Sequence, residues 1–476
     1  MSLLHCKEIL LQSGLASELA LLCGILLLCI LSFFAPGSSY GIGFWVALFA
    51  IGTSFFLSQT TPTEGEFYSI TFDFFTGYLK KVFGVMVSVA LFSFLEWKNG
   101  RNFQARTEIL ILLLISQLSL SILVQAKSLW LIFLAAETFS VCAFALARPL
   151  GTGKSESGSI LKYFATGSIA SAIGIFGLTW ILGFQGTALE ASNDILSSAA
   201  FFPVAGSVFF VSFLLFKLGA FPFHFWVPEV FEQAPTPFAG YLASAPKLAA
   251  AFALLHVVAV IEPNVTFPLI VLAFIGSFFG NLAALGSKNI KNLLAFSGIG
   301  QAGFLLIPAI FSKQISGSDY HLLIFGVGYS IVIQAAFCAV QYFENHLKDN
   351  LMVKDLAGQF NMHPLPSILF IVLLVSLIGL PPTIGFTGKL LLFSGILGGS
   401  NLFTKDILFI LYGLGIGTTI LSLSYYLMIP YFLIFKDKQM EDLPYRNSSA
   451  SLLWIILASL FAILSFFSPA TFIPML

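Results

Sequence analysis

The sequence predicts an all-α polytopic membrane protein with about fourteen transmembrane helices. Its 476 residues are 58% hydrophobic and only 9% charged, whereas soluble domains carry about a quarter charged residues. The mean hydropathy is +0.96, and apolar runs of about eighteen or more residues, enough to cross a bilayer, recur along the chain. In a bilayer, backbone polar groups must be bonded within helices or closed barrels. Because the runs do not alternate as barrel strands do, we expect helices.

Charged and Pro/Gly-rich breaks divide the apolar runs into the predicted helices. They lie near 15–34, 41–58, 77–96, 108–125, 128–147, 158–183, 201–229, 237–261, 266–286, 290–312, 319–343, 364–396, 406–435 and 450–472. The first exceeds the roughly 7–15 apolar residues of a signal-peptide core, and no A-x-A-like site follows it, so we interpret it as a helix. The connections are short, and no soluble domain is expected between the helices.

Basic residues set the expected orientation, because cytoplasmic loops are enriched in lysine and arginine. Loops that follow odd-numbered helices carry 13 basic residues and the opposite side carries 6. This bias puts the loops after odd-numbered helices in the cytoplasm and both termini outside. We expect a bacterial inner-membrane protein with both termini in the periplasm. The remaining three of the 22 basic residues, Lys217, Lys247 and Lys389, lie inside apolar helices.

Composition excludes other classes of function. The formal net charge is zero, so the chain has no electrostatic footprint for nucleic acid. The five cysteines are scattered, without the paired spacing of a zinc or iron–sulfur site. We therefore expect this chain to hold no metal centre and no redox cofactor.

The buried charges suggest proton transport. Besides the three lysines, Glu137 lies near the middle of the fifth predicted helix. A charge at the bilayer centre costs roughly 2.5–3.5 kcal/mol on insertion scales, and such residues mark proton or ion pathways. Moving Glu137 toward or away from Lys217 would load and release a proton. The alternative is that some lysines reach an interface or form a static pair that fixes helix packing.

Two predicted helices, the seventh and the twelfth, are broken at membrane depth. Pro222 interrupts the seventh, and Pro381 and Pro382 interrupt the twelfth. Irregular backbone at that depth must be buried in protein or line a wet cavity, and paired breaks in two halves of a chain indicate a transport site. The breaks lie five helices apart, as two inverted five-helix units require. A merely structural kink remains the alternative for each break.

Polar groups just past the first break and inside the tenth and eleventh predicted helices leave two interpretations open. His224 could relay protons, because imidazole titrates near neutral pH, or it could be satisfied by a freed carbonyl. Ser297, Gln301, Tyr329 and Gln334 could hold water chains or form interhelical hydrogen bonds.

A family resemblance rests on residues around the first break. The segment 216–237, F-K-L-G-A-F-P-F-H-F-W-V-P-E-V-F-E-Q-A-P-T-P, followed by Ser244-Ala245-Pro246-Lys247, closely resembles subunit N of proton-translocating NADH:quinone oxidoreductase, respiratory complex I. Further matches are Gly280-Asn281-Leu282, the segment 291–297, Asp355-Leu356-Ala357-Gly358 and the segment 379–389. The resemblance spans about 130 to 395. The M-type subunit usually has glutamate where this chain has Lys389, which favours the N-type.

The resemblance implies roles for the buried charges. Glu137 and Lys217 would form a switchable pair, Lys247 would lie on a central hydrophilic axis, and Lys389 would pass the proton outward. The implied fold is two inverted repeats, 108–261 and 266–435, between an N-terminal part, 1–107, and a C-terminal helix, 436–476. Glu229 and Gln233 depart from the aspartate and glycine usual in the family.

The resemblance also implies the partners and places the cofactors elsewhere. NADH, FMN, iron–sulfur clusters and quinone would belong to other subunits, and the partners would be the lipid bilayer and neighbouring M-type and K/J-type membrane subunits. One alternative is a subunit of a multi-subunit cation/proton antiporter, which shares the fold. The other is a structural membrane scaffold without transport.

Overall fold

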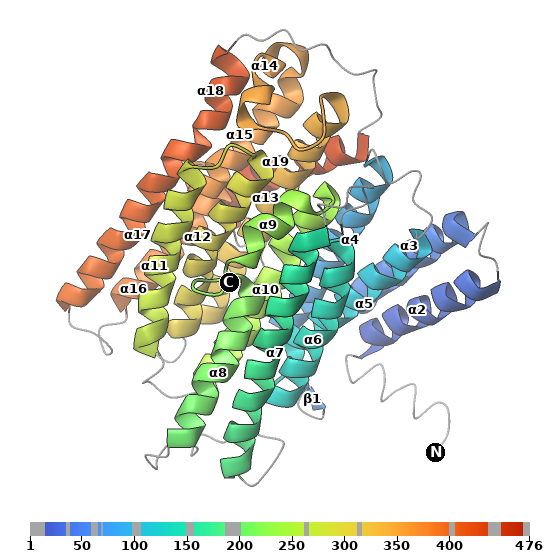
Figure 1. Ribbon diagram of the computed structural model, residues 1–476, viewed down its shortest axis with the longest axis vertical. Helices are drawn as coiled ribbons and strands as arrows, with labels where there is room; N and C mark the ends of the chain where they lie inside the picture. Colours follow the sequence, from blue (N-terminus) through green and yellow to red (C-terminus); the bar gives the residue numbers. More distant parts are fainter. Residues whose placement is uncertain are drawn as a thin grey trace.

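A computed structural model describes residues 15–34, 39–58, 65–67, 70–97, 106–148, 157–185, 201–260, 266–311, 317–398, 405–436 and 449–469. Within these ranges the chain is almost entirely helical, and most helices run side by side in one bundle from which α2 and α3 project (Figure 1). Both chain ends, and with them the predicted periplasmic termini, lie outside the described residues, as do loop lysines such as Lys154 and Lys313.

Each of the fourteen predicted helices has a counterpart among the described residues, which confirms the fold class. Eleven helices there are long and apolar enough to cross a membrane, and four shorter apolar helices accompany them. In chain order the crossings are α2 (Ala16–Phe34), α3 (Ser39–Leu57), α4 (Phe74–Glu96), α5 (Arg106–Gln125), α6 (Leu129–Leu146), α7 (Ser157–Gln185), α8 (Phe201–Leu218) with α9 (Trp226–Gln233), α10 (Thr236–Val260), α11 (Thr266–Leu285), α12 (Ile290–Ile310), α13 (Ser318–His346), α15 (Pro364–Ile378) with α16 (Ile384–Gly398), α17 (Lys405–Tyr426) with α18 (Met428–Phe435), and α19 (Ser449–Phe467).

Polar side chains define several helix starts. Asp73 caps α4, accepting from the backbone N–H of Thr76 at 2.7 Å, while the Thr76 hydroxyl accepts from the backbone N–H of Asp73. Asn289 caps α12. The start of α19 is held by Glu96 at the end of α4, whose carboxylate accepts from the backbone N–H groups of Ala450 and Ser451 at 2.6 and 2.9 Å. These caps satisfy backbone donors that have no partner within the helix.

Small elements outside the crossings were not predicted. Strands β1 (Gly65–Phe67) and β2 (Ile70–Phe72) form a two-stranded antiparallel sheet in which Glu66 pairs with Thr71. A 3₁₀ helix, η4 (Val353–Leu356), and the short α14 (Gln359–Met362) precede α15. Their start is set by Asp355, whose carboxylate accepts from the backbone N–H of Met352 and pairs with Lys348 at 2.8 Å. The matched Asp355-Leu-Ala-Gly segment thus shapes a connection.

Burial is greatest in three helices at the centre of the bundle. In the apolar windows of α10, α12 and α13, 94% of residues are buried, against 28% in α2. Helices α10, α12 and α13 pack against one another. A charged residue in the middle of one of these helices is therefore surrounded by protein. The division of the chain into repeat units 108–261 and 266–435 stays a prediction.

Candidate functional site

The two helix breaks end in the same local geometry. Gly219 after α8 and Gly379 after α15 both have positive φ, 67° and 86°, a conformation that favours glycine. The next residue donates its N–H five residues back, from Ala220 to Leu215 at 3.0 Å and from Leu380 to Val375 at 3.2 Å, as in a Schellman C-cap. Each helix therefore ends at its glycine, before the prolines that were expected to interrupt it.

Glu137 and Lys217 form the expected ion pair. The Nζ of Lys217, in the last turn of α8, lies 2.7 Å from Oε1 of Glu137 in the middle of α6. Lys217 also donates to the Ser140 hydroxyl at 2.6 Å, and the Ser171 hydroxyl donates to Glu137 at 2.7 Å. The lysine side chain is 9% exposed and the glutamate side chain 29%. Glu137 therefore lies at the edge of the chain and Lys217 further inside.

A small cavity extends from Lys217 toward α10. It measures about 20 Å³ and is lined by Lys217, Ser140 and the α10 residues Leu242 and Pro246, among others. Pro246 lies inside α10, and a proline leaves the carbonyl four residues earlier, here that of Leu242, without its helical donor. A cavity of this size with polar partners can hold one water molecule.

Lys247 follows Pro246 and is buried at the centre of the bundle. The lysine is 1% exposed, and its Nζ donates to the backbone carbonyl of Gly298 on α12 at 2.7 Å. A Cβ added to Gly298 would lie 3.1 Å from Lys247 Nζ and 3.1 Å from the Tyr329 hydroxyl. Glycine at this position therefore lets the ammonium group and the Tyr329 hydroxyl approach the same stretch of α12 backbone.

Polar groups continue beyond Lys247 toward the second break. Ser297 and Tyr426 share a hydrogen bond between their hydroxyls, and Gln301 lies one turn after Ser297 on α12. Gln301 in turn donates to the carbonyl of Leu377 at 2.9 Å, in the last turn of α15. The sequence left open whether Ser297, Gln301 and Tyr329 hold water chains or form interhelical hydrogen bonds. In the structure they lie between Lys247 and Lys389.

Lys389 occupies the second break itself. Its Nζ donates to the carbonyl of Ile378, the last residue of α15, at 2.8 Å, and to Thr419 of α17 at 3.4 Å. The ammonium group also lies 4.9 Å from the centre of the Phe304 ring. Two carbonyls that the end of α15 leaves exposed, those of Leu377 and Ile378, are therefore taken by Gln301 and Lys389.

Two predicted polar residues lie elsewhere. His224 is buried just past the first break, and its ring packs against Phe221, Phe225 and Phe279. Gln334 donates to the carbonyl of Met86 on α4 at 2.8 Å, so its interhelical interpretation holds. These contacts do not bring either residue to the buried lysines.

A second buried ion pair was missed in the sequence. Lys80 on α4 pairs with Glu18 on α2 at 2.7 Å, with side chains 5% and 7% exposed. Gln125 of α5 also donates to Glu18 at 2.7 Å, so the pair joins three helices. Lys80 is one of the 6 basic residues expected in loops on the side opposite the odd-helix loops, and this expectation is wrong. The position of Lys80 inside the predicted helix 77–96 is the feature of the sequence that indicates its burial.

Two further charges near helix ends are also buried. Lys291, at the start of α12, is 6% exposed and donates to the carbonyl of Ala234. Glu344 on α13 is 4% exposed and accepts from the Thr236 hydroxyl. They hold the starts of α10 and α12 against α13, at the end of the bundle opposite the α4 start.

The two departures from the family pattern have partners on α7. Glu229 pairs with Lys162 at 3.0 Å, and Gln233 accepts from the Ser159 hydroxyl. Both contacts fasten α9 to α7 and leave the buried charges untouched. Among the described residues no three His, Cys, Asp or Glu side chains gather as a metal site would require.

Comparison with known proteins places this arrangement in a family. The profile of the NADH:quinone oxidoreductase/Mrp antiporter transmembrane family matches residues 126–415. NADH-quinone oxidoreductase subunit N of Azorhizobium caulinodans is 32% identical over 357 residues, 73% of each chain. Subunit N 2 of Thermodesulfovibrio yellowstonii is 29% identical over 90% of this chain and 93% of its own.

Solved structures share the fold. A chain of respiratory complex I from Thermus thermophilus has a TM-score of 0.79 at 23% identity, covering 96% of this chain and 98% of that one. A chain of the Mrp complex from Dietzia sp. has a TM-score of 0.80 at 16% identity, covering 96% and 95%. The chain therefore belongs to the NADH:quinone oxidoreductase/Mrp antiporter family of membrane subunits, in which the relatives it matches are named subunit N.

Proposed function

We propose that this chain is the N-type membrane-arm subunit of NADH:quinone oxidoreductase and moves protons from the cytoplasm to the periplasm. The route runs from the Glu137–Lys217 pair through Lys247 to Lys389. The observation that carries the proposal is Lys247, a lysine at the centre of the bundle whose ammonium group donates to a backbone carbonyl. Among the described residues no carboxylate forms a salt bridge with it, and a charge in that place indicates a functional rather than a packing role.

The steps of the route follow from the contacts. Glu137 is partly exposed at the edge of the chain, so it can respond to a charge on a neighbouring subunit. When Glu137 moves away, Lys217 loses its counter-charge and can release a proton through the small cavity toward α10. Lys247, the hydroxyls of Tyr329 and Tyr426, and Gln301 then lead to Lys389. Protein conformation supplies this movement, and its energy comes from redox chemistry in other subunits.

The proposal assigns cofactors and partners to the rest of the complex. NADH, FMN, iron–sulfur clusters and quinone are proposed to bind other subunits, and the neighbours are proposed to be M-type and K/J-type membrane subunits. Reporter tags at each terminus test the orientation. The lysine bias predicts that both are reached from the periplasm, and cytoplasmic exposure of both would overturn the predicted topology.

A cation/proton antiporter subunit is the second candidate, because the fold is shared with a chain of an Mrp complex. Affinity purification of the tagged chain from its native membrane separates the two. The N-type proposal predicts that NADH:quinone reductase activity co-purifies with the chain. Recovery of a complex that exchanges sodium for protons, without NADH oxidation, would instead establish the antiporter.

A further inference from the structure

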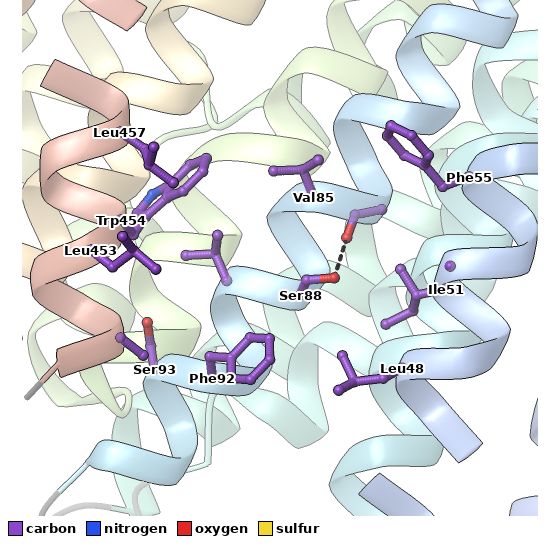
Figure 2. Close-up of a pocket in the computed structure, with 14 residues that line it drawn as sticks. Leu48, Ile51, Phe55, Val85, Ser88, Phe92, Ser93, Leu453, Trp454 and Leu457 are labelled. Carbon is purple, nitrogen blue, oxygen red and sulfur yellow. Dashed lines mark hydrogen bonds between the residues drawn. The ribbon is translucent and has the colours of Figure 1, made fainter. Parts of the chain in front are cut away.

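A narrow apolar cavity of about 400 Å³ lies on α4, between α3 and α19. Figure 2 shows its walls: side chains of α3 line one side, those of α19 the other, and α4 forms the floor. The wall residues from α3 and α19 are Leu48, Ile51, Phe55, Leu453, Trp454 and Leu457. Because α4 and α19 are apolar and long enough to cross a membrane, and α3 is a shorter apolar helix beside them, the cavity lies at the depth of lipid chains.

The dimensions of the cavity suit an extended chain. Its floor runs from Gly84 to Ser93 on α4, about 14 Å at the helical rise of 1.5 Å per residue. A hydrocarbon chain can lie along a floor of this length between the two apolar walls.

The two ends of the cavity differ in charge. Lys81 lies one turn before Gly84 and Val85 on α4, and its ammonium group lies 5.8 Å from the centre of the Phe55 ring in the cavity wall. The adjacent Lys80 points instead into the bundle, where Glu18 neutralises it. At the opposite end, the Glu96 carboxylate holds the start of α19. An anionic group is therefore attracted to the Lys81 end and repelled from the other.

We propose that this cavity binds one acyl chain of an anionic phospholipid, with the phosphate at Lys81. Lysine near a helix end reaches the membrane interface with its ammonium group, and a juxtamembrane lysine attracts anionic lipid. The bound chain fills the gap between the N-terminal helix α3 and the C-terminal helix α19. The proposal is independent of the proton route.

Photo-crosslinking in the intact purified complex tests the site. The complex is reconstituted with phosphatidylglycerol that carries a diazirine on its acyl chain, or with phosphatidylcholine that carries the same chain, and labelled peptides of α3, α4 and α19 are quantified. We expect about fivefold more labelling by the anionic probe, the contribution of one lysine near a membrane surface. The substitution Lys81→Gln should abolish this preference without removing the cavity.

A steric block and its matched control complete the test. Gly52 lines the cavity, and a Cβ added there meets no atom within 4 Å, so the side chain of Gly52→Leu begins in open space and should narrow the cavity. Gly41 is on the same helix, and a Cβ there is equally free, but Gly41 is not among the lining residues. Gly52→Leu should lower labelling by both probes, and Gly41→Leu should keep it. Unchanged labelling in Gly52→Leu, or equal labelling by both probes in the unsubstituted complex, would overturn the proposal.

Discussion

Substitution of Gly298 by alanine inserts one methyl group between the two polar groups at the centre of the proposed route. The added Cβ would lie 3.1 Å from both Lys247 Nζ and the Tyr329 hydroxyl, so each must shift by a few tenths of an ångström. Lys247 is 1% exposed and has little room to move. We therefore expect the hydrogen bond from Lys247 to the Gly298 carbonyl, now 2.7 Å, to lengthen or break.

The size of the effect follows from that bond. Hydrogen bonds to charged groups contribute about 1.5–3 kcal/mol, and a loss of about 1.4 kcal/mol slows a step roughly tenfold. Folding should not suffer from the backbone, because alanine is favoured over glycine by about 1 kcal/mol inside a helix. Gly298→Ala should therefore assemble normally and slow NADH-driven proton pumping by about tenfold.

The assay is acidification of proteoliposomes that contain purified complex, driven by NADH and normalised to assembled complex. Gly413→Ala, on α17, is the matched control, because a Cβ there meets no atom within 4 Å. The control should pump at the unsubstituted rate. If Gly298→Ala also pumps at that rate, the contact between Lys247 and α12 has no part in proton transfer.

Three further predictions test the helix caps and the ion pairs. Gly219→Ala and Gly379→Ala should each destabilise the chain by about 1–2 kcal/mol or more, because both positions have left-handed backbone, and a lower yield of assembled complex would show it. Lys80→Met removes one partner of the buried Lys80–Glu18 pair and should lower the free energy of unfolding by about 3–5 kcal/mol. The double variant with Glu18→Gln should recover part of this loss. Thermal unfolding of the single and double variants measures the two losses, and additive losses would contradict the prediction. Lys162→Ala should change stability by less than about 1 kcal/mol and leave pumping unchanged, because its pair is 68% and 48% exposed.

Residue placement along the apolar runs was enough to predict the fourteen crossings and the principal charges. Lys217, Lys247 and Lys389 could be found because each lies far from any charged break, so burial was the only placement left. The pairing of Lys217 with Glu137 came from a family resemblance, and the structure confirms the contact at 2.7 Å. Spacing along the chain cannot show that two side chains 80 residues apart meet.

Charges near helix ends were the least predictable. Lys80 and Glu18 each lie within a few residues of a helix start, where a lysine or glutamate usually reaches water. They are buried because α2, α4 and α5 meet there, which is a tertiary feature. The glycine caps at the two breaks were also not predicted. Proline is the stronger signal of a helix interruption in a sequence, but Gly219 and Gly379 end the helices.

The most direct test of the proton route is pumping by complexes in which a central lysine is removed. Lys217→Ala and Lys247→Ala are prepared in the intact complex, and NADH-driven proton uptake into proteoliposomes is measured beside subunit content. The proposed route predicts that both complexes assemble and that both pump less than the unsubstituted complex. Full pumping by both variants at normal assembly would show that these lysines only fix helix packing, and would contradict the account.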